Sequence, residues 1–245
     1  PRFDPLKAHF ISQYNTSIPC ACFNQQQKQT SHAPRQVAYS HLHSVWHWLP
    51  KPIACRISAM NDLIVLNKPY GVICQFSEHE KHPTLKTLVD VPHFYPAGRL
   101  DTDSEGLLLL TNNGGLQAQI ANPKFKVKKT YWAQVEGVPS EDALNQLRRG
   151  VDLGDFVTRP AKVRILAEEE YAQLWERNPP IRVRKSIPDT WIEVQISEGK
   201  NRQVRRMTAK AGLPCLRLVR VAIGQIHLLE LGVPLGQWQY VNQRP

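Results

Sequence analysis

A run of four leucines at residues 107–110 is the feature that most constrains how this chain folds. The run follows Gly106 and a stretch of charged residues, which is typical of a short strand buried inside a sheet. It is far shorter than the roughly 18–20 apolar residues of a membrane-spanning helix, and no segment of the chain approaches that length. The sequence therefore predicts a protein with a β-sheet core and no membrane partner.

Other segments predict the rest of the fold. Strands are indicated where Val, Ile, Leu, Tyr and Trp concentrate, at residues 63–67, 106–111, 130–136, 190–197 and 215–223. Helices are expected at 141–149, after the N-cap Ser140, and at about 201–211, and each ends before a glycine. The Asn113-Gly114 pair indicates a tight turn. Because helices do not regularly separate the strands, we predict an α+β domain with a largely antiparallel mixed sheet flanked by helices.

Residues 1–59 differ from the rest of the chain. They are rich in glutamine, hold five of the nine histidines and show no strand or helix period, so we expect a poorly ordered extension. Met60 stands directly before the first predicted strand. We therefore expect one folded domain at residues 60–245, and Met60 is a candidate native start.

The charge of the chain favours a polyanionic partner, because 31 Lys+Arg and 21 Asp+Glu leave a formal net charge of +10. The excess is greatest at residues 177–220, which contain eleven basic side chains and three acidic ones. This segment is the predicted polyanion-binding surface. An ordinary solvated basic face is the alternative.

The cysteines and glycines argue against several classes of site. Five scattered cysteines do not suggest a disulfide framework and favour a reducing, cytoplasmic location. The spacings of Cys20 with Cys22 and of His41 with His43 and His47 resemble metal-ligand patterns, but no further ligand pair completes them, so no metal is expected. The glycines form neither a Walker loop nor a dinucleotide fingerprint, so no nucleotide cofactor is expected.

The strongest chemical signal precedes the leucine run. In an extended chain Arg99 and Asp101 project to one side and Leu100 to the other. Gly98 and Gly106 bracket a bend. A carboxylate beside an arginine at a rigid strand entry suits a nucleophile or base, and an Asp-capped turn with solvated charges is the alternative.

The helix expected at 201–211 has two faces. Its apolar face, which must meet the core, holds Val204, Met207 and Ala211. Its basic face, which suits phosphates, holds Arg202, Arg206 and Lys210. Arg205 lies beside Val204 at the border of the core, where an unpaired charge is unfavourable. Arg205 therefore needs a carboxylate partner, and Asp101 is the predicted one.

Residues 124–132 interleave four lysines with aromatic side chains. This arrangement suits phosphate contact combined with base stacking. A tyrosine in a core strand, such as Tyr131, is more often a packed aromatic, so the segment alone leaves both interpretations open.

Four segments, in this order, resemble the motifs of the RNA pseudouridine synthases, in the branch that acts on bacterial ribosomal RNA. They are Asn-Lys-Pro-Tyr-Gly at 67–71, Gly-Arg-Leu-Asp at 98–101 with the leucine run, Lys-Thr-Tyr at 129–131, and Gly-Lys-Asn-Arg-Gln-Val-Arg-Arg-Met at 199–207. From residue 60 to about 240, including an insert at 177–188, the chain is similar to members that modify large-subunit rRNA. Most members carry an N-terminal S4 domain. Residues 1–59 do not resemble one, as expected of the short forms.

The resemblance implies a pseudouridine synthase fold and an isomerisation that needs neither metal nor cofactor. The N1–C1′ bond of a uridine breaks, the uracil rotates, and C5 joins C1′. The implied partner is 23S rRNA, free or in an assembling large subunit, and the implied enzyme is a cytoplasmic monomer. The same reaction on small-subunit rRNA and a non-catalytic rRNA-binding or assembly factor are the alternatives. The presence together of Asp101, Tyr131 and Arg205 favours an enzyme.

The resemblance also implies roles for individual residues. Asp101 is the catalytic carboxylate, which either attacks C1′ or abstracts a ribose proton, and Arg205 is its ion-pair partner. Tyr131 stacks on the uracil, and a phenol is only a weak base for the C5 proton. Val204 packs beneath the base. The residues expected to bind the RNA are Arg99, Lys129, Arg202, Arg206 and Lys210, with non-specific affinity from Lys124, Lys126 and Lys128.

Overall fold

A computed structural model describes residues 62–182 and 186–245 of the chain. The predicted extension at 1–59, Met60 and the metal-like spacings between Cys20 and His47 lie outside the described residues. The strands are β1 (Leu63–Lys68), β2 (Tyr95–Pro96), β3 (Glu105–Thr111), β4 (Lys129–Glu136), β5 (Lys162–Ile165), β6 (Asp189–Ile196), β7 (Cys215–Ile223), β8 (Ile226–His227) and β9 (Trp238–Tyr240). The helices are α1 (Gly114–Ala121), α2 (Glu141–Arg149), α3 (Glu168–Tyr171) and α4 (Gln203–Lys210), with 3₁₀ helices η1 (Leu85–Thr87) and η2 (Pro123–Phe125).

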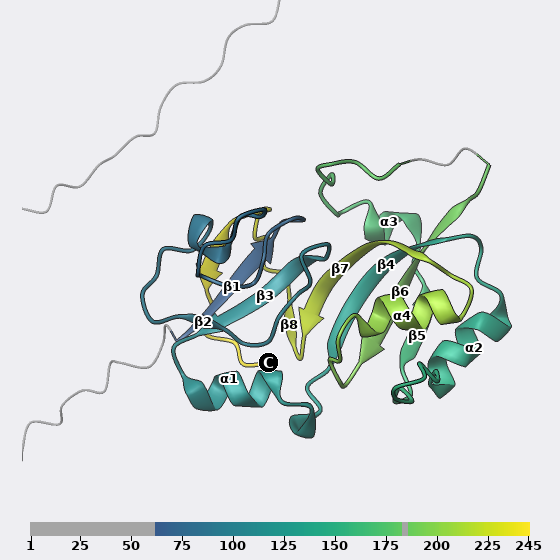
Figure 1. The fold of residues 1–245 in the computed structure, drawn as a ribbon, viewed down its shortest axis with the longest axis horizontal. Coiled ribbons are helices and arrows are strands. Elements are labelled where there is room, and N and C mark those ends of the chain that lie inside the picture. The colour runs from purple at the N-terminus through teal and green to yellow at the C-terminus, as the bar shows by residue number, and fades with distance from the viewer. Residues whose placement is uncertain (1–61, 183–185) are drawn as a thin grey trace, which may run out of the picture. The chain divides into compact units, whose positions relative to one another are not determined.

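These strands form one mixed sheet in the order β5-β6-β4-β7-β3-β1-β9, with β2 beside β3 and β8 beside β7. The only parallel pairing in this described sheet is β3 with β7, which places Gly106 opposite Arg220. The predicted α+β architecture with a largely antiparallel sheet is confirmed. In Figure 1 the β3–β7 junction joins one half of the sheet, containing β1 and β3, to the other, containing β4, β6 and β7.

The junction requires a glycine on β3. The backbone of Gly106 has a φ of +97°, and a Cβ atom there would lie 2.4 Å from the carbonyl oxygen of Arg220. An L side chain is disfavoured by both the conformation and the contact. Gly106 therefore lets β3 approach β7 closely, just where the chain enters the buried leucine run.

The leucine run is buried on both faces of the sheet, as predicted. All four leucines of residues 107–110 are fully buried. Leu107 and Leu109 pack in the cluster that contains Ile120 of α1. Leu108 and Leu110 pack in the opposite cluster, with Val204 of α4. Successive side chains of a strand point to opposite faces, so this one strand supports both layers that cover the sheet.

Two predicted helices are present, with one correction. Helix α2 has the expected bounds, and the Ser140 hydroxyl accepts a hydrogen bond from the Ala143 amide at 3.2 Å. Helix α4 begins at Gln203 and not at 201, because Arg202 adopts a left-handed conformation with φ 48°. A residue in that conformation cannot continue a right-handed helix, so Arg202 lies in the turn before α4.

The tight turn predicted at Asn113-Gly114 is wrong. Asn113 is the N-cap of α1, and its side-chain oxygen accepts hydrogen bonds from the amides of Gly115 and Leu116. Asn-Gly also favours hairpin turns, and two glycines at the start of α1 conceal the helix because glycine has a low helix propensity. Burial of Leu116 and Ile120 against the sheet stabilises α1 in spite of that propensity.

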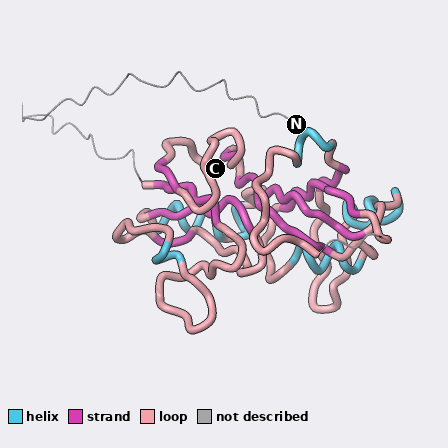
Figure 2. The backbone as a smooth tube through the Cα atoms, turned by 90° about the horizontal axis from the view of Figure 1, so that it is seen from above, coloured by secondary structure: helices cyan, strands magenta, loops and turns pink. Residues whose placement is uncertain are grey.

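Figure 2 shows the strands as a band across the described domain, with helices and long loops on either side. No helix within residues 62–182 and 186–245 has the length and apolar character needed to cross a bilayer.

Candidate active site

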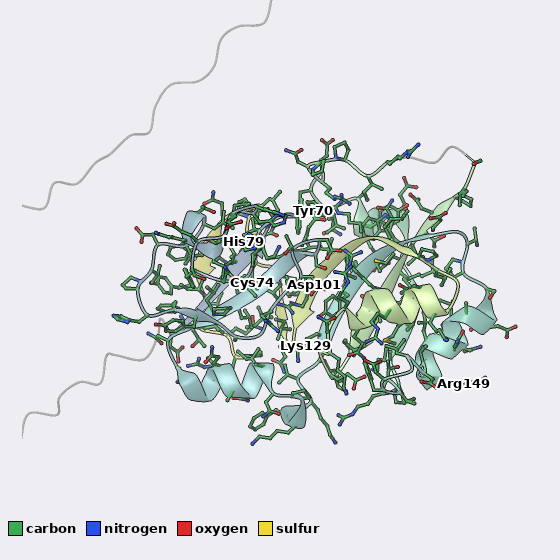
Figure 3. The ribbon with its side chains drawn as sticks, in the orientation of Figure 1. Tyr70, Cys74, His79, Asp101, Lys129 and Arg149 are labelled. Atoms are coloured by element: carbon green, nitrogen blue, oxygen red, sulfur yellow. The ribbon has the colours of Figure 1, made fainter. Side chains whose placement is uncertain are left out.

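A pocket of about 630 Å³ lies beside the β3–β7 junction. Its walls are the 97–104 segment between β2 and β3, the turn before α4, and side chains of β4 and β7. Figure 3 shows Asp101 and Lys129 near the middle of the domain, between the two halves of the sheet. The predicted site residues that line the pocket are Arg99, Asp101, Lys129, Tyr131, Arg202 and Val204. Six of the predicted site residues therefore meet in one pocket, although they are spread over about a hundred residues of the chain.

The backbone beside Asp101 is held by the Asn-Lys-Pro-Tyr-Gly segment that follows β1. The Lys68 ammonium is fully buried and donates to the carbonyl oxygen of Ser104 at 2.8 Å. The amide of Gly71 donates to the carbonyl oxygen of Thr102 at 2.8 Å. Burial lowers the pKa of Lys68 to about 8, partly offset by the negative charges of nearby groups. Lys68 and Gly71 thus fix the turn that carries Asp101.

Tyr131 reaches the pocket through an irregularity in β4. The pairing of β4 with β7 shifts register between Thr130 and Tyr131, which sets Tyr131 opposite Arg220. Such irregularities re-aim side chains and are common beside active sites. The Tyr131 ring is mostly buried, and the Arg220 guanidinium lies 6.0 Å from its centroid. Tyr131 therefore offers a flat aromatic surface inside the pocket, as its predicted stacking role requires.

Arg220 is a site residue that the sequence did not reveal. It is buried, and its guanidinium donates to the carbonyl oxygens of Leu107 at 2.8 Å and Arg99 at 3.3 Å. These two contacts hold both ends of the turn around Asp101. An arginine among the apolar residues of a predicted strand was the available signal, but its partners are backbone atoms more than 110 residues away, which spacing cannot indicate.

The predicted ion pair between Arg205 and Asp101 is not present, because Arg205 binds Asp103. Arg205 Nε lies 3.4 Å from the Asp103 carboxylate, and Arg205 Nη2 donates to the Asp103 carbonyl oxygen at 2.7 Å. Among the described residues, the arginine within ion-pair distance of Asp101 is Arg202, whose Nη1 lies 3.8 Å from Asp101 Oδ2. The helix geometry was correct in requiring a carboxylate for Arg205. It could not distinguish two aspartates that are two residues apart.

Asp103 is the centre of this ion-pair network. Arg202 binds it with two hydrogen bonds, of 3.0 and 2.8 Å. Partial burial raises the pKa of Asp103, but the hydrogen bonds from Arg202 and the charge of Arg205 outweigh it, so the pKa is below its ordinary value. The ionised Asp103 thereby keeps both arginines close to Asp101.

Two predicted RNA-binding residues lie outside the pocket lining. Arg206 forms a two-pronged ion pair with Asp155 and lies 5.4 Å from the centroid of the Phe156 ring. Lys210 is exposed at the end of α4. The predicted basic face is therefore divided, since Arg202 precedes the helix and Arg206 is turned toward the loop before β5.

Lys129 is a buried cation in the lining of the pocket. Its side chain is buried, and its ammonium donates to the carbonyl oxygen of Val127 at 3.0 Å. Burial, with a smaller contribution from the positive charge of Arg220, lowers the pKa of Lys129 to about 8. Lys129 can therefore lose its charge within an accessible pH range.

A second feature that the sequence did not reveal supports the site from behind. Glu105, at the start of β3, and Arg217 of β7 form a buried ion pair at 2.8 Å, with side chains only 2% and 9% exposed. Trp175 Nε1 donates to Glu105 at 2.9 Å. This network fixes the beginning of β3 directly after the turn that carries Asp101.

In the described residues no group of three or more His, Cys, Asp or Glu side chains could hold a metal ion.

The pocket beside the buried sheet is lined by a carboxylate, an aromatic ring and several cations. This arrangement agrees with the RNA pseudouridine synthases, the family that the four sequence motifs resemble. Residues 62–210 match the family model of RNA pseudouridylate synthases. Because that match covers more than half of the chain, this protein belongs to the RNA pseudouridylate synthase family, which confirms the resemblance and identifies the chain as an isomerase.

Two relatives and one solved structure show which members of the family this chain is similar to. The chain is 57% identical over 169 residues to "Ribosomal large subunit pseudouridine synthase E" of Xanthomonas axonopodis pv. citri, covering 68% of this chain and 87% of the relative. It is 51% identical over 184 residues to the protein of the same name from Vibrio vulnificus, covering 75% and 76%. A crystal structure of a pseudouridylate synthase superposes with a TM-score of 0.60 at 30% identity, over 74% of this chain and 70% of that one.

Proposed function

We propose that this protein converts one uridine of large-subunit (23S) rRNA to pseudouridine and that Asp101 is its catalytic carboxylate. The observation that carries the proposal is the position of Asp101 in the pocket, in the Gly-Arg-Leu-Asp segment of a chain 57% identical to a large-subunit synthase. The pocket of about 630 Å³ falls in the size range of sites that enclose a small molecule, and an extruded nucleotide is of that size.

In the proposed reaction the N1–C1′ bond breaks, the freed uracil rotates, C5 bonds to C1′, and the proton on C5 leaves while N1 gains one. The atoms of substrate and product are the same, so no oxidant or group donor is needed. Asp101 acts either by bonding to C1′ as N1 departs or by removing a ribose proton. Both roles require the carboxylate to be ionised, and the guanidinium of Arg202 lies 3.8 Å from Asp101 Oδ2.

Other pocket residues hold the base during rotation. Tyr131 stacks on one face of the uracil. Val204 lies in the wall of the same pocket and packs beneath the base. Stacking is tolerant of rotation about the ring normal, because the aromatic surface has no fixed hydrogen-bond partner for the base. Arg99, exposed at the rim, contacts the RNA backbone near the target.

The proposal includes the setting of the reaction. The enzyme acts as a monomer in the cytoplasm, on free 23S rRNA or on an assembling large subunit. Light scattering of the purified protein tests the monomer, and comparing naked rRNA with assembly intermediates as substrates separates the two forms of RNA.

The direct test is a pseudouridine map of rRNA, by carbodiimide labelling and primer extension, from cells with and without the gene. We expect one large-subunit site to disappear on deletion. The wild-type gene restores it, and Asp101→Asn does not. Loss of a small-subunit site would reassign the substrate. An unchanged map, with rRNA binding retained, would favour the non-catalytic binding factor.

A further inference from the structure

We propose that the loop at residues 122–128 is a docking site for single-stranded RNA beside the pocket, where an unpaired base within about four nucleotides of the target uridine stacks on Phe125. The inference rests on the proposed RNA substrate and extends it to the nucleotides that flank the target. It is carried by the exposure of Phe125, by the charge of the loop, and by the way the loop is anchored.

Phe125 is presented to solvent. Its side chain is 47% exposed, and it belongs to none of the packed apolar clusters of the described residues. The ring contact recorded for it is with Lys124, whose ammonium lies 4.8 Å from the ring centroid. A single exposed aromatic is common on protein surfaces, so exposure alone does not identify a site. The surroundings of Phe125 distinguish it.

The loop is strongly and uniformly positive. Residues 106–135 contain four lysines and no acidic residue. Lys124, Lys126 and Lys128 are exposed, and none of them forms a salt bridge with another residue of the described ranges. Unpaired lysines around an aromatic ring are the combination that binds single-stranded nucleic acid, with cations on the phosphates and the ring on a base.

Hydrogen bonds hold the turn that carries Phe125 in a defined conformation. The Asn122 side chain accepts from the Lys124 amide at 3.0 Å, and the Phe125 amide donates to the Asn122 carbonyl oxygen at 3.2 Å. The Lys126 amide donates to the Pro123 carbonyl oxygen at 3.2 Å, and Lys126 itself is left-handed, with φ 54°. These bonds order the backbone that carries the ring before any RNA binds, which reduces the entropy lost on binding.

Both ends of the loop are attached to the pocket. Ala121, four residues before Phe125, and Lys129, four residues after it, line the pocket. The amide of Gly224 donates to the carbonyl oxygen of Lys128 at 2.8 Å, which ties the loop to the end of β7. Four residues span at most about 14 Å, and stacked nucleotides rise about 3.4 Å each along a strand. Phe125 is therefore within about four nucleotides of a uridine held in the pocket.

The test measures RNA binding without turnover. The probes are a fluorescein-labelled oligouridylate of ~12 nucleotides and an RNA duplex of equal length. For Phe125→Ala we expect Kd for the single strand to rise about ten- to hundredfold, the range that one lost base stack produces, with little change for the duplex. Phe125→Trp should bind as wild type does, and Phe125→Leu should bind as weakly as the alanine variant, because leucine has no π face.

Tyr240→Ala is the matched control, since Tyr240 is an aromatic residue of similar exposure (40%) on the edge strand β9 and does not line the pocket. Its affinity for the oligouridylate should stay within about twofold of wild type. If Phe125→Ala also stays within that range, or if Phe125→Leu restores binding, the stacking site is overturned.

The outcome is independent of the proposed reaction. If the pseudouridine map shows no dependence on the gene but Phe125→Ala still weakens single-strand binding, the docking site stands and the reaction fails. If the map identifies a site and Phe125→Ala binds and reacts like wild type, the docking site fails and the reaction stands.

Discussion

Two basic regions border the pocket. The charges of one are paired with carboxylates, and those of the other are not. Around α4, the arginines are matched with acids: Arg202 and Arg205 with Asp103, and Arg206 with Asp155. In the 122–128 loop the lysines meet no carboxylate within the described residues. The segment 177–220, which contains α4, has eleven basic and three acidic side chains, yet the loop has more charge free for a phosphate.

The difference teaches that charge density in a sequence does not by itself locate a nucleic-acid surface. An arginine that is already bound by a carboxylate releases few counterions from RNA, whereas an unpaired lysine can neutralise a phosphate directly. We infer that the α4 arginines organise the chemistry around Asp101 and that the loop lysines supply affinity. Substitutions in the first region should therefore lower the rate, and substitutions in the second should weaken binding.

The largest effect is expected for Asp101→Asn, which keeps the shape of the side chain and removes the catalytic carboxylate. Single-turnover isomerisation should fall by at least about a thousandfold, while Kd for rRNA stays within about twofold. Turnover near the wild-type rate would show that Asp101 is not the catalytic carboxylate. A large loss of binding would contradict the claim that the region around Asp101 sets the rate while the loop sets the affinity.

The next largest effect is expected for Arg205→Met, which leaves Asp103 with one arginine partner. An under-satisfied, partly buried carboxylate costs about 1–3 kcal/mol, so urea denaturation should show a loss of that size. The single-turnover rate should fall about ten- to hundredfold, because the turn beside Asp101 loses its contact with α4. The double variant with Asp103→Asn should recover part of the stability, and failure to do so would break the proposed network.

A smaller effect, on binding alone, is expected for the combined variant Lys124→Gln, Lys126→Gln and Lys128→Gln. The slope of log Kd against log salt should become shallower by about 2, since each lost contact with a single strand removes about 0.7. Arg206→Gln, which removes one paired cation, should leave the slope nearly unchanged. Equal slope changes per charge in the two variants would contradict the comparison.

The smallest effect is expected from the titration of Lys129. Its pKa of about 8 means that the ammonium is charged at pH 7 and largely neutral at pH 9, so RNA affinity should fall as pH rises through 8. One charge contact at about 4 Å in water is worth about 1 kcal/mol, or roughly fivefold in Kd. Lys129→Met should lack this step between pH 7 and 9, and the exposed Lys210→Met should keep it.

The same lowered pKa has a consequence for stability. Because burial lowers the pKa of Lys129 from 10.5 in the unfolded chain to about 8 in the fold, the unfolded chain binds more protons between these values. The free energy of unfolding should therefore rise with pH from about 8 to 10.5. Lys129→Met should show a smaller rise across that window in urea titrations, and an equal rise would place the titrating group elsewhere.

Local pattern alone determined much of this protein. The leucines at 107–110, the apolar stripe of Val204 and Met207, and the Ser140 cap are set by spacing along the chain, because a strand repeats every two residues and a helix every 3.6. The motif segments likewise identified the pocket residues Asp101, Tyr131 and Lys129. The strand, helix and cap depend on neighbours within one element, which a sequence displays directly, whereas the pocket residues follow from the resemblance of the motif segments to a known family.

Only the tertiary structure decided which distant groups meet. Arg205 contacts Asp103 and not Asp101, Lys68 supports the carbonyl of Ser104, and Arg220 holds the turn from another strand. A two-residue difference in register changes the partner of a charge without changing any helix or strand pattern. The division between paired arginines and unpaired lysines arises in the same way, since Coulomb interactions depend on distances in space that sheet order and loop geometry fix after the local elements have formed.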